Sequence, residues 1–216
     1  MTPLLGRLHV ITDATFQDRF SHVELAELAA RGGADAVQFR EKRSWTARAL
    51  VETAAAMRRA LEDTPVCLVV DDRVDVAIAA GVRAVHLGRD DLDVATARRL
   101  LGEGALIGGT ANSLAEALRV AATAVDYLGV GPVFGTVSKA NPAPALGLDA
   151  FRAIVEAVEK PVIAIGSITA DRVRALLDAG AYGVAVISAI TCQPDPERAA
   201  REFRAAIDAW LGVRAA

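Results

Sequence analysis

The chain has 216 residues, of which 53% are hydrophobic and only 5% aromatic, and its formal net charge at pH 7 is -3. A slightly acidic chain lacks the basic surface of nucleic-acid-binding proteins, and no apolar run approaches the roughly 18 residues that span a bilayer. We therefore expect neither a nucleic-acid nor a membrane partner. The only two cysteines, Cys67 in a predicted strand and Cys192 in a late loop, make a disulfide framework improbable. Residues 1–7 lack the apolar core of a signal sequence. Both features are typical of a cytoplasmic protein.

Apolar runs typical of buried strands alternate with helical patterns along the whole chain. The strands that we predict are Leu8–Thr12, Ala36–Phe39, Val66–Val70, Ala84–Leu87, Ala105–Gly108, Tyr127–Val130, Val162–Ile165 and Gly183–Ile187. The main predicted helices are Val23–Arg31, Thr46–Leu61, Leu114–Ala122, Ala150–Val158, Ala170–Ala179 and about Pro196–Leu211. Expected C-caps are Gly32, Gly81, Gly102 and Gly180, and expected N-caps are Asp93, Asp149 and Thr169.

Eight strands with helical segments between them favour a closed (β/α)8 barrel, a TIM barrel, formed by residues 1–216 as one domain. The alternative is a doubly wound sheet, which usually has about five or six strands. No Pro- or Ser-rich linker divides the chain. Catalytic groups of such barrels gather past the carboxyl ends of the strands, so polar residues in those positions are our candidates.

A polar and doubly basic stripe ends the second predicted strand, in the segment Gln38-Phe-Arg40-Glu-Lys42. Because alternate side chains of a strand share one face, Gln38, Arg40 and Lys42 should point together, while Phe39 faces the helices. Arg and Lys are common ligands of phosphate oxygens, so the stripe predicts an anion site. The alternative is a structural network of ion pairs with nearby aspartates.

Two acidic pairs, Asp71-Asp72 and Asp90-Asp91, follow the third and fourth predicted strands. Parallel neighbouring strands would bring both pairs to the same end of the sheet, where their carboxylates repel each other unless a cation lies among them. Oxygen ligands suit Mg²⁺, and we take Asp72 and Asp91 as its candidate ligands. Taken singly, either could instead cap the helix that follows.

The three histidines differ in their expected surroundings. His86 lies in the fourth strand, and alternation with Ala84 directs it toward the barrel axis, where it would line a pocket. A lone histidine in an apolar strand is nevertheless more often a core residue. His9 has a similar place in the first strand, and we expect His22 at the surface.

The segment from Gly131 to Lys139 opens the longest predicted loop, which runs to Leu148. Long loops in compact domains usually carry function or are disordered. Thr136 and Ser138 could donate to one ligand while Lys139 adds positive charge. The alternative is a solvent-exposed lid tip.

Gly166 follows the seventh predicted strand and Ser188 the eighth. Barrels often bind phosphate there through backbone N–H groups, and a glycine permits close approach. The cations of the basic stripe and the long loop, with Mg²⁺, exceed what one monophosphate needs. We therefore expect two anionic small-molecule substrates, a diphosphate and a separate phosphate.

Seven segments, taken in chain order, resemble the thiamine phosphate synthase family. They are LHVITD at 8–13, VQFREK at 37–42, DDRVDVA at 71–77, VHLGRDD at 85–91, DYLGVGPVFGTVSK at 126–139, PVIAIGSI at 161–168 and GVAVISAI at 183–190. Together they cover nearly the whole chain. The resemblance implies an enzyme that, with Mg²⁺, couples hydroxymethylpyrimidine diphosphate to thiazole phosphate and releases pyrophosphate.

The resemblance also implies roles for individual residues. It places the catalytic groups at Arg40, Lys42, Thr110 and Lys139, and the Mg²⁺ ligands at Asp72 and Asp91. The remaining implied substrate contacts lie in five places along the chain: Gln38, Phe39 and Glu41; Asp71; His86; Thr136, Val137 and Ser138; and Gly166, Ile187 and Ser188.

The chain departs from the family pattern at several of these positions. Asp71 stands where the family usually has Asn, which brings a carboxylate close to an anionic substrate. Arg89 replaces a usual Gln, and our hypothesis is that it balances the charge of Asp71. The family often has Ser at the position of Thr110 and Thr at the position of Ser138, so both positions keep a hydroxyl group. His9 replaces a tyrosine, and Ser167 replaces the second glycine of a GGI motif.

Two alternative functions stay open on the sequence. The first is the related thiazole tautomerase, whose working histidine would fall at Asn112, an amide that cannot shuttle protons at neutral pH. The second is a non-catalytic phosphate-binding or regulatory barrel, which would follow if Asp71 disables diphosphate binding. The sequence does not determine the oligomeric state.

Overall fold

The computed structural model describes residues 5–135 and 143–215. In it, eight parallel strands pair in chain order, and β1 pairs with β8 to close the barrel. The strands are β1 (Leu8–Asp13), β2 (Ala36–Arg40), β3 (Cys67–Asp71), β4 (Ala84–Leu87), β5 (Leu106–Ala111), β6 (Tyr127–Val130), β7 (Val162–Ile165) and β8 (Gly183–Val186). The predicted TIM barrel is therefore confirmed, and all eight predicted strands are present.

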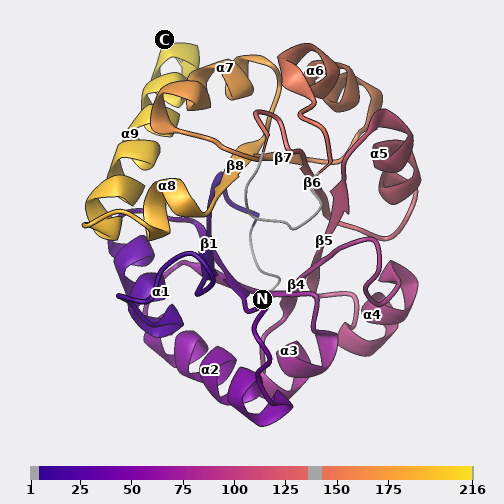
Figure 1. Cartoon of the computed structure of the whole chain (residues 1–216). Helices are drawn as coiled ribbons and strands as arrows, with labels where there is room; N and C mark the ends of the chain where they lie inside the picture. Colours follow the sequence, from indigo (N-terminus) through magenta and orange to yellow (C-terminus); the bar gives the residue numbers. More distant parts are fainter. Residues whose placement is uncertain (1–4, 136–142, 216) are drawn as a thin grey trace.

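Helices surround the strands on the outside of the barrel, which Figure 1 shows end-on. They are α1 (His22–Arg31), α2 (Ala47–Ala60), α3 (Val74–Ala80), α4 (Val94–Leu101), α5 (Leu114–Ala121), α6 (Gly147–Ala157), the 3₁₀ helix η1 (Ala170–Arg172), α7 (Val173–Asp178), α8 (Ser188–Thr191) and α9 (Pro196–Ala215). Within the described ranges, no helix is both long and apolar enough to cross a membrane.

Strand residues alternate between two apolar clusters, as the period of two requires. On β2, Val37 and Phe39 pack into the outer cluster against the helices, while Ala36 belongs to an inner cluster along the barrel axis. Gln38 and Arg40 share the inner side and line a cavity there. The predicted division of this strand into two faces is confirmed.

Most helix ends follow the predicted capping residues, but the C-cap of α7 is Ala179 rather than Gly180, and Thr169 precedes η1 without a side-chain capping hydrogen bond. Asp93 accepts a hydrogen bond from the Thr96 N–H at the start of α4, and Gly81 ends α3 in the left-handed conformation. The prediction that Asp149 is an N-cap is wrong, because α6 already begins at Gly147 and Asp149 lies in its first turn.

Candidate active site

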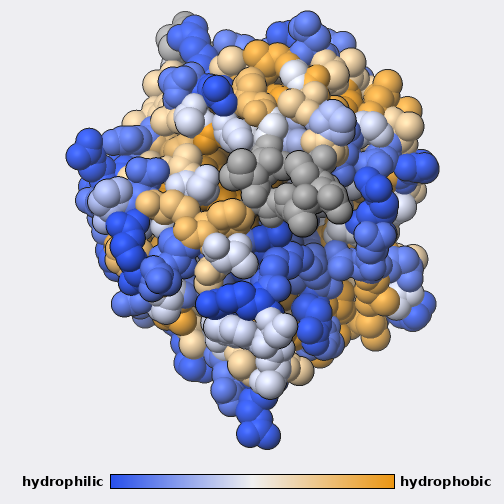
Figure 2. Space-filling model, viewed as in Figure 1, coloured by the Kyte–Doolittle hydropathy of each residue, from blue (hydrophilic) through white to orange (hydrophobic). Residues whose placement is uncertain are grey.

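A cavity of about 630 Å³ lies at the carboxyl ends of the strands, and every strand contributes to its lining. Figure 2 shows hydrophilic residues gathered near the centre of this face of the molecule. The predicted site residues that line the cavity are Gln38, Arg40, Lys42, Asp71, Asp72, His86, Asp91, Thr110, Gly166 and Ile187. The fold thus brings together residues from β2, β3, β4 and β5 and from the segments that follow β2, β3, β4, β7 and β8.

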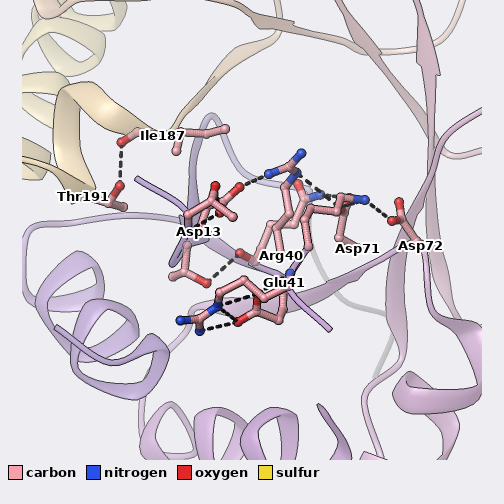
Figure 3. A network of polar contacts seen from close by, with 12 residues as sticks. Asp13, Arg40, Glu41, Asp71, Asp72, Ile187 and Thr191 are labelled. Atoms are coloured by element: carbon pink, nitrogen blue, oxygen red, sulfur yellow. Dashed lines mark hydrogen bonds and ion pairs between the residues drawn. The ribbon is translucent and has the colours of Figure 1, made fainter. Parts of the chain in front are cut away.

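The basic stripe of β2 meets the carboxylates of two neighbouring strands (Figure 3). Arg40 forms an ion pair with Asp13 on one side, and its Nε lies 3.6 Å from Asp71 Oδ2 on the other. Lys42 pairs with Asp72, and its Nζ lies 3.3 Å from Asp71 Oδ2. The ion-pair network that was the alternative for this stripe is therefore present, while the anion site stays a prediction.

The candidate metal ligands, Asp72 and Asp91, contact each other at the edge of the cavity. Burial alone would raise the pKa of Asp72, but the hydrogen bond from Lys42 and the charges of Lys42 and Arg40, with the hydrogen bond to Asp91, together outweigh it and lower that pKa. The pKa of Asp91 is raised by burial and by its hydrogen bond with Asp72. The Gly88 N–H donates to Asp91 Oδ2 at 2.6 Å and fixes this carboxylate at the rim.

Asp71 is held by the basic stripe itself. Gln38 Nε2 donates to Asp71 Oδ1, and burial together with the charge of Asp72 raises the pKa of Asp71 to about 6. Arg89 instead donates to Glu116 Oε1 at 2.8 Å. The contacts give Asp71 and Arg89 different partners, so we expect Arg89→Gln and Asp71→Asn to act independently on activity, contrary to the compensation hypothesis.

The floor of the cavity is a hydrogen-bonded group around His86. Its Nε2 lies 2.9 Å from Thr110 Oγ1, and its Nδ1 lies 3.2 Å from the hydroxyl of Tyr127. A Cβ added at Gly108 would come within 2.2 Å of the Tyr127 ring and 2.5 Å of His86 Nδ1, and one at Gly129 within 2.8 Å of His86 Cε1. These two glycines therefore make room for the imidazole and the phenol.

A second cavity of about 430 Å³ adjoins the first past β7 and β8, and Gly166, Ile187 and Ser188 line it. Gly166 has a φ of +110°, and Ser167, which stands where the family has glycine, has a φ of +46°. Arg172 donates to the Ser167 carbonyl at 2.7 Å and stacks on the Phe134 ring. The backbone after β7 is thus tied to the segment that follows β6.

Several predicted site residues do not line the main cavity. Phe39 packs under the helices, and Glu41 points away from the cavity into an ion pair with Arg43. The prediction that His22 lies at the surface is wrong: it is buried, 2.7 Å from Thr12 Oγ1 and 3.3 Å from Glu41 Oε2. The predictions for Thr136, Val137, Ser138 and Lys139 lie outside the described residues.

Replacing Glu41 with glutamine should lower the free energy of unfolding by about 3 kcal/mol at neutral pH. Burial opposes ionisation of Glu41, but hydrogen bonds from Arg43 and His22 outweigh it and lower the Glu41 pKa from 4.5 to about 2. A lowered folded-state pKa stabilises the protein above pH 4.5, and this contribution is lost as the pH falls toward 2.

Urea unfolding of wild type and Glu41→Gln between pH 7 and pH 2 measures the effect. The difference in unfolding free energy should be constant near neutrality and shrink below pH 4.5. Glu62→Gln, at an exposed turn after α2, is the matched control and should change stability by less than about 0.5 kcal/mol. A Glu41→Gln difference that does not depend on pH would contradict the ion-pair explanation.

Sequence reasoning missed two residues of this region. Asp13 ends β1 fully buried beside Arg40, and Tyr127 is fully buried beneath His86. For Asp13 a signal was present: it alternates with His9 and Ile11 and comes at the carboxyl end of a strand, where candidates were sought. Asn112, the tautomerase position, also lines the cavity, and its amide donates to the Gly131 carbonyl.

Comparison with known proteins gives one consistent result. Residues 8–190 match the family described as thiamine monophosphate synthase. The thiamine-phosphate synthase of Salinibacter ruber is 48% identical over 207 residues, 96% of this chain and 91% of that protein. That of Agrobacterium fabrum is 47% identical over 213 residues, 96% of each. The solved thiamine phosphate pyrophosphorylase of Pyrococcus furiosus superposes with a TM-score of 0.85 at 36% identity, over 95% of this chain and 97% of that one.

Proposed function

Because the chain belongs to the thiamine monophosphate synthase family, we propose that it joins 4-amino-5-hydroxymethyl-2-methylpyrimidine diphosphate to thiazole phosphate. The products are thiamine phosphate and pyrophosphate, which makes the enzyme a transferase of thiamine biosynthesis. Its partners are these two small molecules, with no nucleic acid or membrane, and its place of action is the cytoplasm.

One observation carries the proposal: Arg40 and Lys42 line the same cavity as the carboxylates of Asp72 and Asp91. Guanidinium and ammonium groups suit the oxygens of a diphosphate. Past β7 and β8, the second cavity at Gly166, Ile187 and Ser188 offers a place for the thiazole phosphate. The two cavities share Gly166 and Ile187, so two anionic substrates would lie side by side.

The donor set around the basic stripe fits Mg²⁺. Asp13, Asp71, Asp72 and Asp91 bring four carboxylates against two cations, Arg40 and Lys42, so negative charge is in excess before a diphosphate arrives. In the described part of the chain, no three acidic, His or Cys residues are arranged to hold a metal. Mg²⁺ is often bound by one or two carboxylates together with substrate phosphates, and Asp72 and Asp91 would supply these.

Different side chains of the cavity neutralise the charge of the diphosphate and hold the pyrimidine. Loss of pyrophosphate from the pyrimidine carbon places charge on the departing oxygens, which Arg40 and Lys42 neutralise. Bound Mg²⁺ supplies further charge neutralisation on the diphosphate. Thr110 and His86, which hydrogen-bond to each other at the cavity floor, hold the pyrimidine. Gln38 holds Asp71 beside the diphosphate.

Of the remaining predicted residues, those of the segment 136–139 keep their proposed roles, whereas Phe39 and Glu41 do not. Lys139 is placed with the diphosphate, and Thr136, Val137 and Ser138 with the thiazole phosphate, on the resemblance alone. Phe39 and Glu41 support the fold of the stripe rather than contact a substrate, because both side chains point away from the cavity.

The assay that tests the proposal supplies both substrates and Mg²⁺ to purified protein and follows thiamine phosphate and pyrophosphate. Metal-dependent formation of both products, abolished by EDTA, is the expected result. A folded protein that binds the diphosphate without forming product would indicate the non-catalytic barrel. Isomerisation of a thiazole carboxylate phosphate would indicate the tautomerase.

A further inference from the structure

We propose that Asp13 is a positioning residue of the diphosphate site, and that its carboxylate holds the Arg40 guanidinium in the orientation that receives the diphosphate. The inference rests on the proposed function and adds to it a residue that lies behind the cavity.

The two residues come from neighbouring strands at the same level. Asp13 is the last residue of β1, Arg40 is the last of β2, and they are direct partners in the register of the sheet. His9 and Ile11 alternate with Asp13 along β1, and both line the cavity. Asp13 therefore points to the inner side of the barrel, as Arg40 does (Figure 3).

The carboxylate of Asp13 is fully buried, with no exposed surface. Its Oδ1 accepts hydrogen bonds from the Thr15 N–H at 2.9 Å and from the Thr15 hydroxyl at 2.6 Å, while its Oδ2 forms the ion pair with Arg40 Nη1. A buried carboxylate is costly unless it is paired. The two bonds from Thr15 set the plane of the carboxylate, and the ion pair then sets the position of Arg40.

Arg40 lies between Asp13 and Asp71 with its side chain only 12% exposed, and it lines the cavity. Asp13 is not among the described residues that line the cavity. An effect of Asp13 on the substrate must therefore pass through Arg40. An arginine whose side chain is already fixed in the folded protein has lost its rotamer freedom, so less conformational entropy is lost when the diphosphate binds.

A simple neutralising role for Asp13 predicts the opposite result. If Asp13 only offset the charge of Arg40, its removal would leave more positive charge for the diphosphate, and binding would tighten. If Asp13 positions Arg40, its removal weakens binding. In Asp13→Asn the Thr15 bonds to Oδ1 are kept, but an amide N–H faces a guanidinium N–H, which turns the arginine away.

The experiment measures binding of inorganic pyrophosphate with Mg²⁺ by calorimetry, and the KM of each substrate, for wild type and Asp13→Asn. We expect the Kd for pyrophosphate and the KM for the pyrimidine diphosphate to rise about ten- to a hundredfold. The KM for thiazole phosphate should stay within about twofold. Unchanged or tighter pyrophosphate binding would overturn the proposal.

Asp35→Asn is the matched control at the opposite end of the barrel. Asp35 also carries an ion pair, with Arg204 at 3.1 Å, and accepts hydrogen bonds from the backbone of Arg7 and Leu8. Its replacement should lower the melting temperature and leave pyrophosphate binding unchanged. Equal losses of binding in Asp13→Asn and Asp35→Asn would mean a general structural effect and would overturn the proposal.

A double-mutant cycle tests whether Asp13 acts through Arg40. In an Arg40→Gln background, adding Asp13→Asn should cause little further loss of pyrophosphate binding. A full additional loss would overturn the proposal. Should Asp13→Asn fail to fold, Thr15→Val removes one donor to the same carboxylate, and we expect about two- to fivefold weaker binding; unchanged binding would then count against the proposal.

Pyrophosphate binding separates this inference from the proposed function. A wild-type protein that binds pyrophosphate but forms no thiamine phosphate would contradict the function, while the comparison of Kd values would still decide the role of Asp13. Product formation by wild type with an unaffected Asp13→Asn would retain the function and reject the positioning role.

Discussion

Asp91→Asn should reduce turnover about 10²–10³-fold without destabilising the protein. The Gly88 N–H that donates to Asp91 Oδ2 can still donate to the amide oxygen of asparagine, so the local backbone is kept. What is lost is a negative charge beside Asp72, which is the charge that a bound cation would meet. Since the two carboxylates are in contact and the pKa of Asp91 is raised, removing one relieves repulsion.

Activity and stability should therefore change in different directions. Steady-state rates at several Mg²⁺ concentrations should show a lower kcat and a higher Mg²⁺ requirement, while the free energy of unfolding stays equal or rises by up to about 1 kcal/mol. Asp75→Asn is the matched control, because Asp75 is exposed in the first turn of α3 and pairs with Arg73, which precedes that helix. Turnover near the wild-type rate in Asp91→Asn would rule out its assignment as a metal ligand.

Gly166→Ala should lower the free energy of unfolding by about 2–4 kcal/mol and raise the KM for thiazole phosphate. Gly166 has a φ of +110°, which side-chain-bearing residues rarely adopt. A Cβ there would lie 2.6 Å from Pro132 Cα and 2.8 Å from the Gly135 carbonyl oxygen. The sequence predicted that Gly166 permits close approach of a phosphate, and the structure shows that a Cβ there would clash with the backbone after β6.

Ser167→Gly is the paired test at the next position. Ser167 has a φ of +46°, so glycine relieves backbone strain there at the cost of a more flexible unfolded chain, and stability should stay within about 1 kcal/mol of wild type. Urea unfolding and substrate saturation curves check both variants. Equal destabilisation by the two substitutions would contradict the explanation from the Cβ clash at Gly166.

The period of two in strands made one side of β2 predictable. Val37 and Phe39 pack outward and Gln38 and Arg40 inward, as the alternation requires. The position of Asp72 and Asp91 at one end of the sheet followed in the same way from parallel neighbouring strands. These features depend only on local periodicity and strand order, which a sequence carries directly.

Other features depended on which residues become neighbours in three dimensions. His22 was expected at the surface, yet it is buried between Thr12 and Glu41, because α1 packs beside β1 and β2. Gly108 and Gly129 are ordinary strand residues in the sequence, and only the closed barrel shows that their missing side chains leave room for His86 and Tyr127.

The sequence by itself determined the barrel, its alternating faces and most of the polar residues at its mouth, because hydrophobic periodicity records which side of a strand is buried. Only the tertiary structure decided the partners of those residues. It placed Asp13 behind Arg40, where the two form an ion pair. It also paired Asp71 with Lys42 of the basic stripe, and Arg89 with Glu116. Charge pairs depend on distances of a few ångströms between separate segments, and these distances are determined by how strands and helices pack.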